Sequence, residues 1–350
     1  MANQTDASVY STAFLLGAYG VIDRPNPFLW NLAFGMEQQF ETEEVYFDKV
    51  ERARRLAPLV HPGDVGQPER LRGFNAASLV PGYVKPKHVI EPNRMLRRRP
   101  GERLLGEFSP EERRAMIVMD TLKIQDDQIT RREEQMACQL IQTGGLVLSG
   151  PNYPQRTAVD LQRNPNHTVV LPNGLRWGDT GVDALDNLRT WAAMVQKNSG
   201  FHPSVVVLDP LAGNLLIKSP GIQQIMNSFR QTKGNVDLGG VVVGGVGREA
   251  KFLGDTGEFE FWVYQQYYTD DAGNVTQFMP DYTCMMLDPV GAQGTRLYGA
   301  IQDVRALRAM PRFPKNWISE DPSAEYLMTQ SAPLPVLGWV DATLCATVRS

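Results

Sequence analysis

The chain has 350 residues, a net charge of -4 and a hydrophobic share of 42%. This composition is that of a globular protein with one large core or two to three smaller ones. It argues against a basic nucleic-acid-binding protein, because phosphate binding needs an excess of positive charge. No apolar run approaches the ~20 residues of a membrane span. Cys138, Cys284 and Cys345 are far apart and lack metal-site spacing, so we expect reduced thiols.

The N-terminal segment 1–36 is predicted to form a short helix followed by an irregular arm. STAFLLGAYGVI resembles the apolar core of a signal peptide, but Asp6 precedes it and no Lys or Arg does. We therefore expect no export. The following RPNPFLWNLAF contains two prolines and several aromatic side chains, which suggests that this part of the arm docks on another surface.

Segment 37–108 changes the sign of its charge along its length. Acidic residues dominate 37–51, and basic residues among prolines and glycines follow. We expect a long β-hairpin over 41–107, with strands near 45–50, 78–84 and 88–97. Its part PGYVKPKHVIEPNRMLRRRPGERLL (81–105) holds four prolines and seven Lys or Arg. Such an arm cannot bury its apolar residues alone, and ordering it costs entropy, so we expect it to lie on another copy of the chain.

The same charge pattern predicts contacts between subunits. Opposite charges on neighbouring subunits set specificity and orientation more than affinity. A solvated loop and a phosphate site are alternatives for the cluster 97–99. The predicted contact residues are Tyr83, Lys85, Lys87, Arg94, Arg97, Arg98, Arg99, Glu41, Glu43 and Glu44.

The strongest local signal predicts a helix over 109–143. Ser109-Pro110-Glu111-Glu112 combines an N-cap, an N1 proline and a capping-box glutamate. Glycines return only at 144 and 145, where they suit a C-terminal left-handed turn. A helix of ~34 residues is roughly 50 Å long. Its centre, QDDQITRREEQ, is almost wholly polar, so we expect one narrow side to pack across a sheet, with a coiled coil as the alternative.

The second half of the chain is predicted to be a compact α+β domain flanked by turn-rich segments. Residues 145–180 read as surface hairpins. Within 183–308 we expect helices at 183–198 and after Ser219-Pro220, a buried strand at SVVVLDP, and strands that include a pair joined by the turn DDAGN. Residues 340–348 alternate apolar and polar side chains, which predicts a half-buried strand paired with a distant segment.

The sequence offers little chemistry. GVGREA (245–250) matches a dinucleotide-binding pattern, but the motif needs a helix directly after its glycines, and glycines at 254 and 257 favour a turn instead. The four histidines never lie within four positions of each other. We therefore predict no catalytic residue, metal or cofactor, and a dinucleotide-binding enzyme is a remote alternative.

Three stretches carry a resemblance to a known family. VPGYVKPKHVIEPNRMLRRRPGE (80–102) resembles the arm segment of the lambda-type major capsid proteins of tailed phages. RLYGAIQDVRA together with RFPKNWISEDPSAEYLMTQSAPLPVL (within 296–337) is similar to that family's most recognisable block, and FETEEVYFDKV (40–50) is similar in kind. The resemblance covers both ends of the chain and the arm, and it is weaker over 145–290.

The resemblance implies an α+β fold of the HK97 capsid type. It implies an N-terminal arm at 1–36, an extended E-loop hairpin at 37–108, a P domain at 109–182 with a spine helix at 109–143, an A domain at 183–308, and a P-domain return at 309–350.

The resemblance also implies how such a protein would act. Hexamers and pentamers would form an icosahedral head around double-stranded DNA, through a procapsid that expands. Portal and scaffolding proteins, and a decoration protein at threefold axes, are the implied partners. The chain would occupy the host cytoplasm during assembly and then the virion. Another self-associating virion protein, such as a tail-tube or receptor-binding protein, is the alternative.

Overall fold

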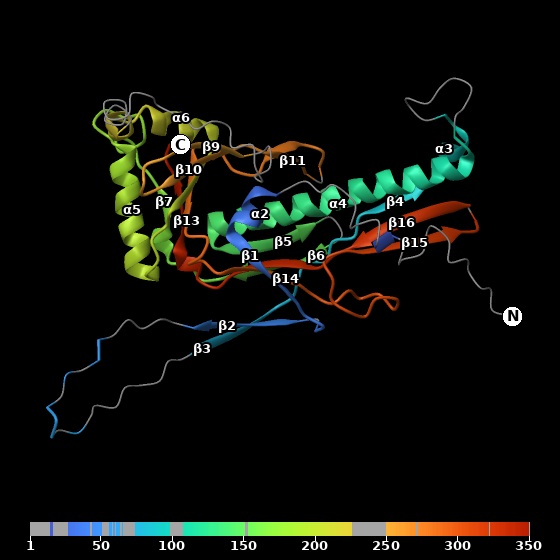
Figure 1. Cartoon of the computed structure of the whole chain (residues 1–350), viewed down its shortest axis with the longest axis horizontal. Coiled ribbons are helices and arrows are strands. Elements are labelled where there is room, and N and C mark those ends of the chain that lie inside the picture. Colours follow the sequence, from blue (N-terminus) through green and yellow to red (C-terminus); the bar gives the residue numbers. More distant parts are fainter. Residues whose placement is uncertain are drawn as a thin grey trace.

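The computed structural model describes residues 15–16, 27–42, 44–50, 56–57, 59, 61–63, 65, 74–98, 108–150, 153–225, 250–270, 272–321 and 323–349. The described chain forms an elongated body (Figure 1). A six-stranded sheet with two helices occupies one end, and a long helix runs from it across smaller sheets to the other end.

The long helix, α4, spans Pro110–Thr143 and confirms the prediction for 109–143. The Ser109 hydroxyl accepts a hydrogen bond from the Glu112 backbone N–H, and the Glu112 carboxylate accepts one from the Ser109 N–H. Gly144 ends the helix with a φ of 74°, a left-handed conformation that glycine adopts without a steric penalty. Both ends of α4 are therefore set by local sequence.

The six-stranded sheet has the order β7-β18-β13-β8-β10-β9. Helices α5 (Ala184–Ser199) and α6 (Pro210–Ile217) cover one face of it. α5 lies at its predicted position, whereas α6 was not predicted. The helix predicted after Ser219-Pro220 is confirmed as far as it is described, because residues 220–225 are helical. The strands are β7 (Thr168–Val170), β18 (Thr343–Thr347), β13 (Thr283–Leu287), β8 (Val205–Leu208), β10 (Glu260–Tyr264) and β9 (Ala250–Asp255).

The C-terminal strand differs from its prediction. β18 pairs with β7 and β13, so the expected distant pairing is confirmed. However, β18 is buried on both faces, because Leu344 and Ala346 pack under α5 while Cys345 packs in the core that contains the C-terminal half of α4. Strands β7 and β18 also lie outside 183–308, so the sheet draws on segments that the sequence placed in the P domain.

Smaller sheets lie under α4 (Figure 1). One has the order β1-β14-β17 and another the order β15-β16-β4, and a hairpin joins β5 to β6. A further hairpin, β11–β12, confirms the pair predicted around DDAGN. Their bounds are β1 (Phe34–Gln39), β14 (Gly294–Tyr298), β17 (Pro333–Leu337), β15 (Phe313–Ser319), β16 (Ala324–Gln330), β4 (Lys87–Ile90), β5 (Gly145–Gly150), β6 (Tyr153–Asp160), β11 (Tyr267–Thr269) and β12 (Val275–Gln277).

The N-terminal segment also differs from its prediction. RPNPFLWNLAF, expected as an irregular arm, contains helix α2 (Phe28–Ala33) and the start of β1. Phe28 stacks 5.7 Å from Tyr264 and lies 5.5 Å from Trp262. These aromatic side chains therefore dock on the chain's own core. The short helix expected in the first part of this segment lies largely outside the described residues, of which 15 and 16 are helical.

The predicted hairpin is shorter than expected. β2 (Val45–Val50) pairs antiparallel with β3 (Phe74–Leu79), and the pair projects from the body in Figure 1. The expected strand at 88–97 is wrong as part of this hairpin. β4 instead pairs with β16, and α3 (Pro92–Leu96) follows it, because Pro92 suits the first position of a helix.

Candidate functional site

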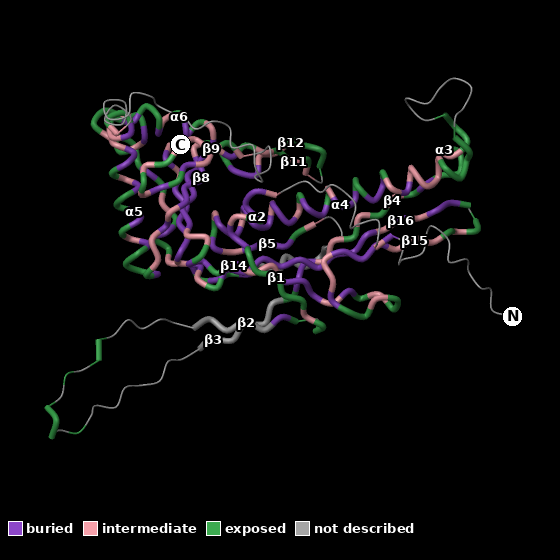
Figure 2. Tube along the Cα trace, in the orientation of Figure 1, coloured by how far each residue is buried: buried purple, intermediate pink, exposed green. Residues whose placement is uncertain are grey.

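The polar centre of α4 is buried, although the sequence predicted a narrow packed stripe. Gln125 and Asp126 have no exposed surface, and Glu133 and Glu134 are 2% and 1% exposed. Figure 2 shows buried residues along the side of α4 that faces the sheets. Buried carboxylates are rare unless they are paired, so the partners of these side chains define the first candidate site.

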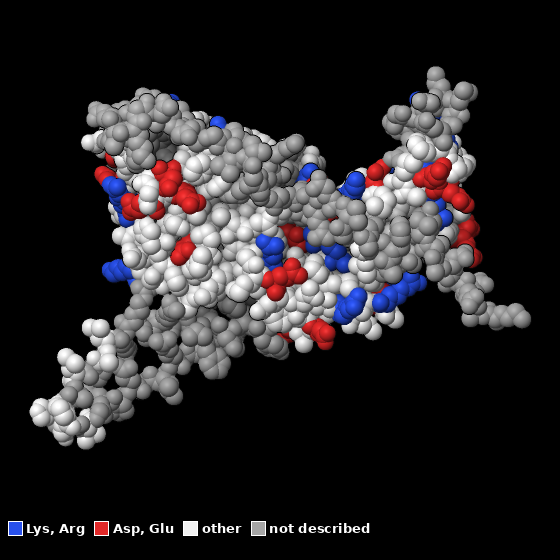
Figure 3. Space-filling model, in the orientation of Figure 1, with Lys and Arg blue, Asp and Glu red and all other residues white. Residues whose placement is uncertain are grey.

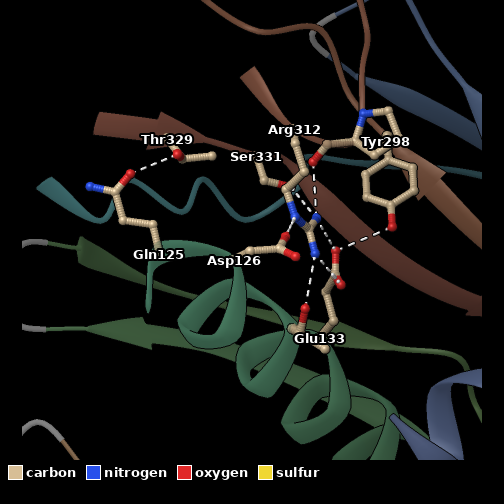
Figure 4. Close-up of polar contacts among 9 residues, drawn as sticks. Gln125, Asp126, Glu133, Tyr298, Arg312, Thr329 and Ser331 are labelled. Carbon is tan, nitrogen blue, oxygen red and sulfur yellow. Dashed lines mark hydrogen bonds and ion pairs between the residues drawn. The ribbon is translucent and has the colours of Figure 1, made fainter. Parts of the chain in front are cut away.

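Arg312, at the start of β15, supplies the central partner (Figure 4). Its Nε donates to Asp126 Oδ1 at 2.8 Å, and its Nη1 and Nη2 donate to the two oxygens of Glu133 at 2.7 and 2.8 Å. Such a two-pronged arginine–carboxylate pair is strong and fixes orientation. Burial acts to lower the pKa of Arg312, but the charge of Glu133 and the hydrogen bonds from Arg312 to it raise that pKa above its ordinary value. Arg312 therefore stays charged.

Neighbouring polar groups complete this network. The Tyr298 hydroxyl donates to Glu133 Oε1 at 3.2 Å, and burial followed by the Glu133 charge raises the pKa of Tyr298, which keeps it a neutral donor. Gln125 donates to the Leu327 carbonyl at 2.8 Å and accepts from the Thr329 hydroxyl at 2.7 Å. These bonds hold α4 against β14, β15 and β16.

Glu134 performs the corresponding role on the adjacent side of α4. Its oxygens accept from the backbone N–H groups of Leu29 and Trp30 at 2.8 and 2.9 Å, and from the Tyr264 hydroxyl at 2.9 Å. The consecutive carboxylates of Glu133 and Glu134 thus join α4 to α2, to the six-stranded sheet and to the smaller sheets. Buried ionic networks are weak evidence for stability, and their best-attested use is to set register.

The second candidate site is the surface that the charge pattern predicted. Tyr83 is half-buried in its own chain, where its hydroxyl donates to Gln330 Oε1 at 2.9 Å and accepts from the Gln302 N–H at 3.0 Å. Lys85 and Lys87 are exposed, and Lys87 belongs to β4. Segment 83–90 therefore does not depend on another copy for its backbone pairing, contrary to the expectation for 81–105, because β16 of the same chain pairs with it.

The remaining predicted contact residues lie on the surface or outside the described residues. Arg94, Arg97 and Arg98 are exposed at the α3 end of the body, where Figure 3 shows acidic and basic side chains close together. Glu41 and Glu44 are exposed near the start of β2. The structure brings neither glutamate into an ion pair with a described lysine or arginine of this set. Arg99 and Glu43 fall outside the described residues.

The described residues contain no group of three His, Cys, Asp or Glu side chains arranged to hold a metal ion. Among their helices, none combines the length and the apolar character that crossing a bilayer needs. The glycines of GVGREA fall outside the described residues, but strand β9 begins at its Ala250, where a dinucleotide motif would need a helix.

Sequence reasoning missed the Arg312 network. Asp126 and Glu133 are seven positions apart, so they share a helix face with Ile129. That face could have been recognised as buried if the polar positions had been read as paired rather than solvated. Arg312 itself gave no local signal, because it lies 179 positions from Glu133.

The fold and these surfaces define a class of protein. A long helix across small sheets, a projecting hairpin and a separate sheet-and-helix end constitute an α+β fold of the HK97 capsid type. A solved structure of a prophage capsid protein from Escherichia coli CFT073 superposes with a TM-score of 0.75 at 20% identity, covering 97% of this chain and 99% of the other. The capsid protein of Ralstonia phage GP4 gives 0.55 at 10% identity, with 100% and 97% covered.

Sequence comparison identifies the family within this class. The model of the family Phage major capsid protein E matches residues 11–348, and the chain belongs to this family. The major capsid protein of Escherichia phage lambda is 30% identical over 338 residues, which are 94% of this chain and 96% of the relative. The major capsid protein of Enterobacteria phage phi80 is 29% identical over 344 residues, or 96% and 98%. The chain is a structural capsid-type protein and not an enzyme.

Proposed function

We propose that this chain is the major capsid protein of a tailed phage. Many copies, arranged as hexamers and pentamers, assemble into an icosahedral head that encloses double-stranded DNA. The observation that carries this proposal is the family match over 11–348, which leaves almost no part of the chain for another activity. The near-complete coverage of the lambda relative supports it.

The structure gives a physical reason for self-association. The β2–β3 hairpin projects from the body, and each strand pairs only with the other among the described residues. A two-stranded hairpin is marginally stable alone in water, so a neighbouring subunit is the natural support for it. Weak contacts of this kind suffice in a closed shell, because every copy is held by several neighbours at once.

The parts of the subunit take the roles that the family implies. The β2–β3 hairpin is the E-loop, α4 is the spine helix, and the six-stranded sheet with α5 and α6 is the A domain. Segments 1–36 and 309–350 are the N-terminal arm and the return to the P domain, from which β18 continues into the A-domain sheet. The shell forms in the host cytoplasm as a procapsid, with portal and scaffolding proteins, and takes a decoration protein at threefold axes after expansion.

Expansion requires a subunit with two stable arrangements. The A-domain core is the rigid part of this proposal, since α5, α6 and the sheet share one apolar cluster. The hairpin is the part that reorients in this proposal, because its two strands pair only with each other among the described residues.

Exposed charges supply contacts between subunits. Arg94, Arg97 and Arg98 bind acidic groups of a neighbour in this proposal. Reversing the charges of Arg97 and Arg98 together should lower the yield of assembled particles, and an unchanged yield would remove these two residues from the interface.

Sedimentation of the purified chain tests the function itself. We expect fast-sedimenting closed particles or capsomers of five and six copies. A chain that stays monomeric under all assembly conditions contradicts the proposal, and tubes of uniform diameter would favour a tail-tube protein instead.

A further inference from the structure

The sheet β15-β16-β4 has one covered face and one partly open face. α4 covers the first face, where Leu327, Glu325 and Ile90 are buried. The alternate residues point to the opposite face, which we call the lysine–aromatic face. Its half-buried or exposed members comprise Lys87, Val89, Lys315, Trp317, Tyr326 and Met328. Phe313, Ala324 and Gln330 lie on the same face but are buried.

The centre of this face is an ordered stack. Trp317 and Tyr326 lie directly opposite each other in the β15–β16 register, and their rings stack with centroids 5.4 Å apart and planes 14° apart. Lys87 Nζ lies 4.2 Å from the Tyr326 ring centroid and 5.2 Å from that of Trp317. A cation over an aromatic ring is attracted by the ring quadrupole, so the ammonium group of Lys87 favours this position.

Two further lysines extend the positive charge. Lys85 Nζ lies 4.4 Å from the Tyr83 ring centroid, on the segment that leads into β4. Lys315 Nζ lies 6.0 Å from the Trp317 ring centroid and pairs with Asp303 at 2.7 Å. The charge of Lys315 is therefore balanced, whereas Lys85 and Lys87 form no ion pair within the described part of the chain.

The chemistry of this face favours a carboxylate-bearing protein partner over a nucleic acid. Single-stranded nucleic acids use exposed ring faces for base stacking, but here ammonium groups already occupy ring faces. Half-buried aromatic side chains next to fixed charges are typical of protein interfaces. Two ammonium groups drawn to neighbouring rings fit a pair of carboxylates on an opposing chain.

The chain itself carries such carboxylates. Glu41 and Glu44 are exposed where β1 leads to β2, and they form no ion pair within the described residues. Glu37, on β1, is also exposed and adds to the same acidic segment. Uncompensated positive and negative groups on one chain are complementary between two copies.

We propose that the lysine–aromatic face receives the acidic segment at Glu37, Glu41 and Glu44 of a second copy, with Lys85 and Lys87 as its charge partners. This inference rests on the proposed function, because both surfaces belong to neighbouring subunits of one shell. It adds a specific receiving surface, on the sheet face opposite α4, to that function.

A charge-swap experiment with the full chain tests the pairing. Lys85→Glu with Lys87→Glu should lower the yield of sedimenting assemblies at least tenfold, and Glu41→Lys with Glu44→Lys should do the same. The combined fourfold variant should recover at least a third of the wild-type yield, because the attraction is restored with its sign exchanged.

Matched controls separate this effect from a general effect of charge. Lys123→Glu with Lys197→Glu changes the net charge equally on exposed positions of α4 and α5, and it should leave the yield within twofold of wild type. Each variant is checked by circular dichroism. If either double variant misfolds, recovery in the fourfold variant remains the deciding measurement.

The outcomes distinguish this inference from the function on which it rests. If the wild type assembles but the lysine reversal does not lower the yield, or the fourfold variant shows no recovery, the pairing is wrong while the capsid function stands. If the lysine reversal spares assembly but abolishes nucleic acid retained in the particles, the face binds DNA and the inference is overturned. If the wild type forms no assemblies, both the proposed pairing and the proposed capsid function are contradicted.

Discussion

Replacing Arg312 with methionine should destabilise the subunit strongly. The change removes the cation that serves Asp126 and both oxygens of Glu133, and it leaves two buried carboxylates without their charge partner. Removing one partner of a buried ion pair costs about 3–5 kcal/mol. That loss is a large share of the ~5–15 kcal/mol by which domains are stable.

Chemical denaturation at neutral pH measures this loss. Because two carboxylates depend on one guanidinium, we expect the free energy of unfolding to decrease by about 5 kcal/mol, the upper end of the range for a broken buried ion pair. Arg312→Lys should lie between wild type and Arg312→Met, since a single ammonium cannot reproduce the two-pronged contact with Glu133.

Two comparisons make the reasoning refutable. Arg131→Met removes an exposed pair with Asp127 at 2.8 Å on the same helix, and it should cost only about 0.3–0.5 kcal/mol. Replacing Arg312, Asp126 and Glu133 together by apolar residues of similar volume should restore most of the stability. A single Arg312→Met variant within ~1 kcal/mol of wild type would show that the network does not hold α4 in place.

Three other predictions concern single positions. Burial lowers the pKa of His167 in the folded state. The contribution of neutral His167 to the free energy of unfolding is therefore present above the unfolded pKa of about 6.5 and is lost as pH falls. His167→Gln should flatten the decline in stability between pH 7.5 and 5, whereas exposed His61→Gln should not. Gly144→Ala would place a Cβ 2.5 Å from the Cβ of Arg163 at a φ of 74° and should lower the melting temperature. An unchanged melting temperature would contradict the left-handed conformation of residue 144 at the end of α4. Ser109→Ala should cost about 1 kcal/mol by urea denaturation, and no loss would mean that the capping box is not formed in solution.

Much of the local structure could be predicted, because it depends on neighbours in the sequence. The bounds of α4 followed from Ser109 and Gly144, and those of α5 followed from an apolar face that ends at Gly200. The β11–β12 hairpin followed from its turn residues. In each case, capping or turn chemistry within a few positions decides the structure.

The long-range contacts could not be predicted. The polar centre of α4 reads as solvated until Arg312 is placed beside it, and that residue lies 186 positions from Asp126. The sequence predicts a neighbouring copy as the support of segment 83–90, because its true partner strand, β16, lies more than two hundred positions away. The charge of Lys87 was visible in the sequence, but its place over the rings of Trp317 and Tyr326 required the sheet register.

Electron microscopy of particles formed by the full chain tests the central claim most directly. The account predicts closed shells whose surface resolves into capsomers of six and five copies, with the β2–β3 hairpin of each copy in contact with a neighbour. A homogeneous population of monomers, or open tubes without fivefold vertices, would contradict it.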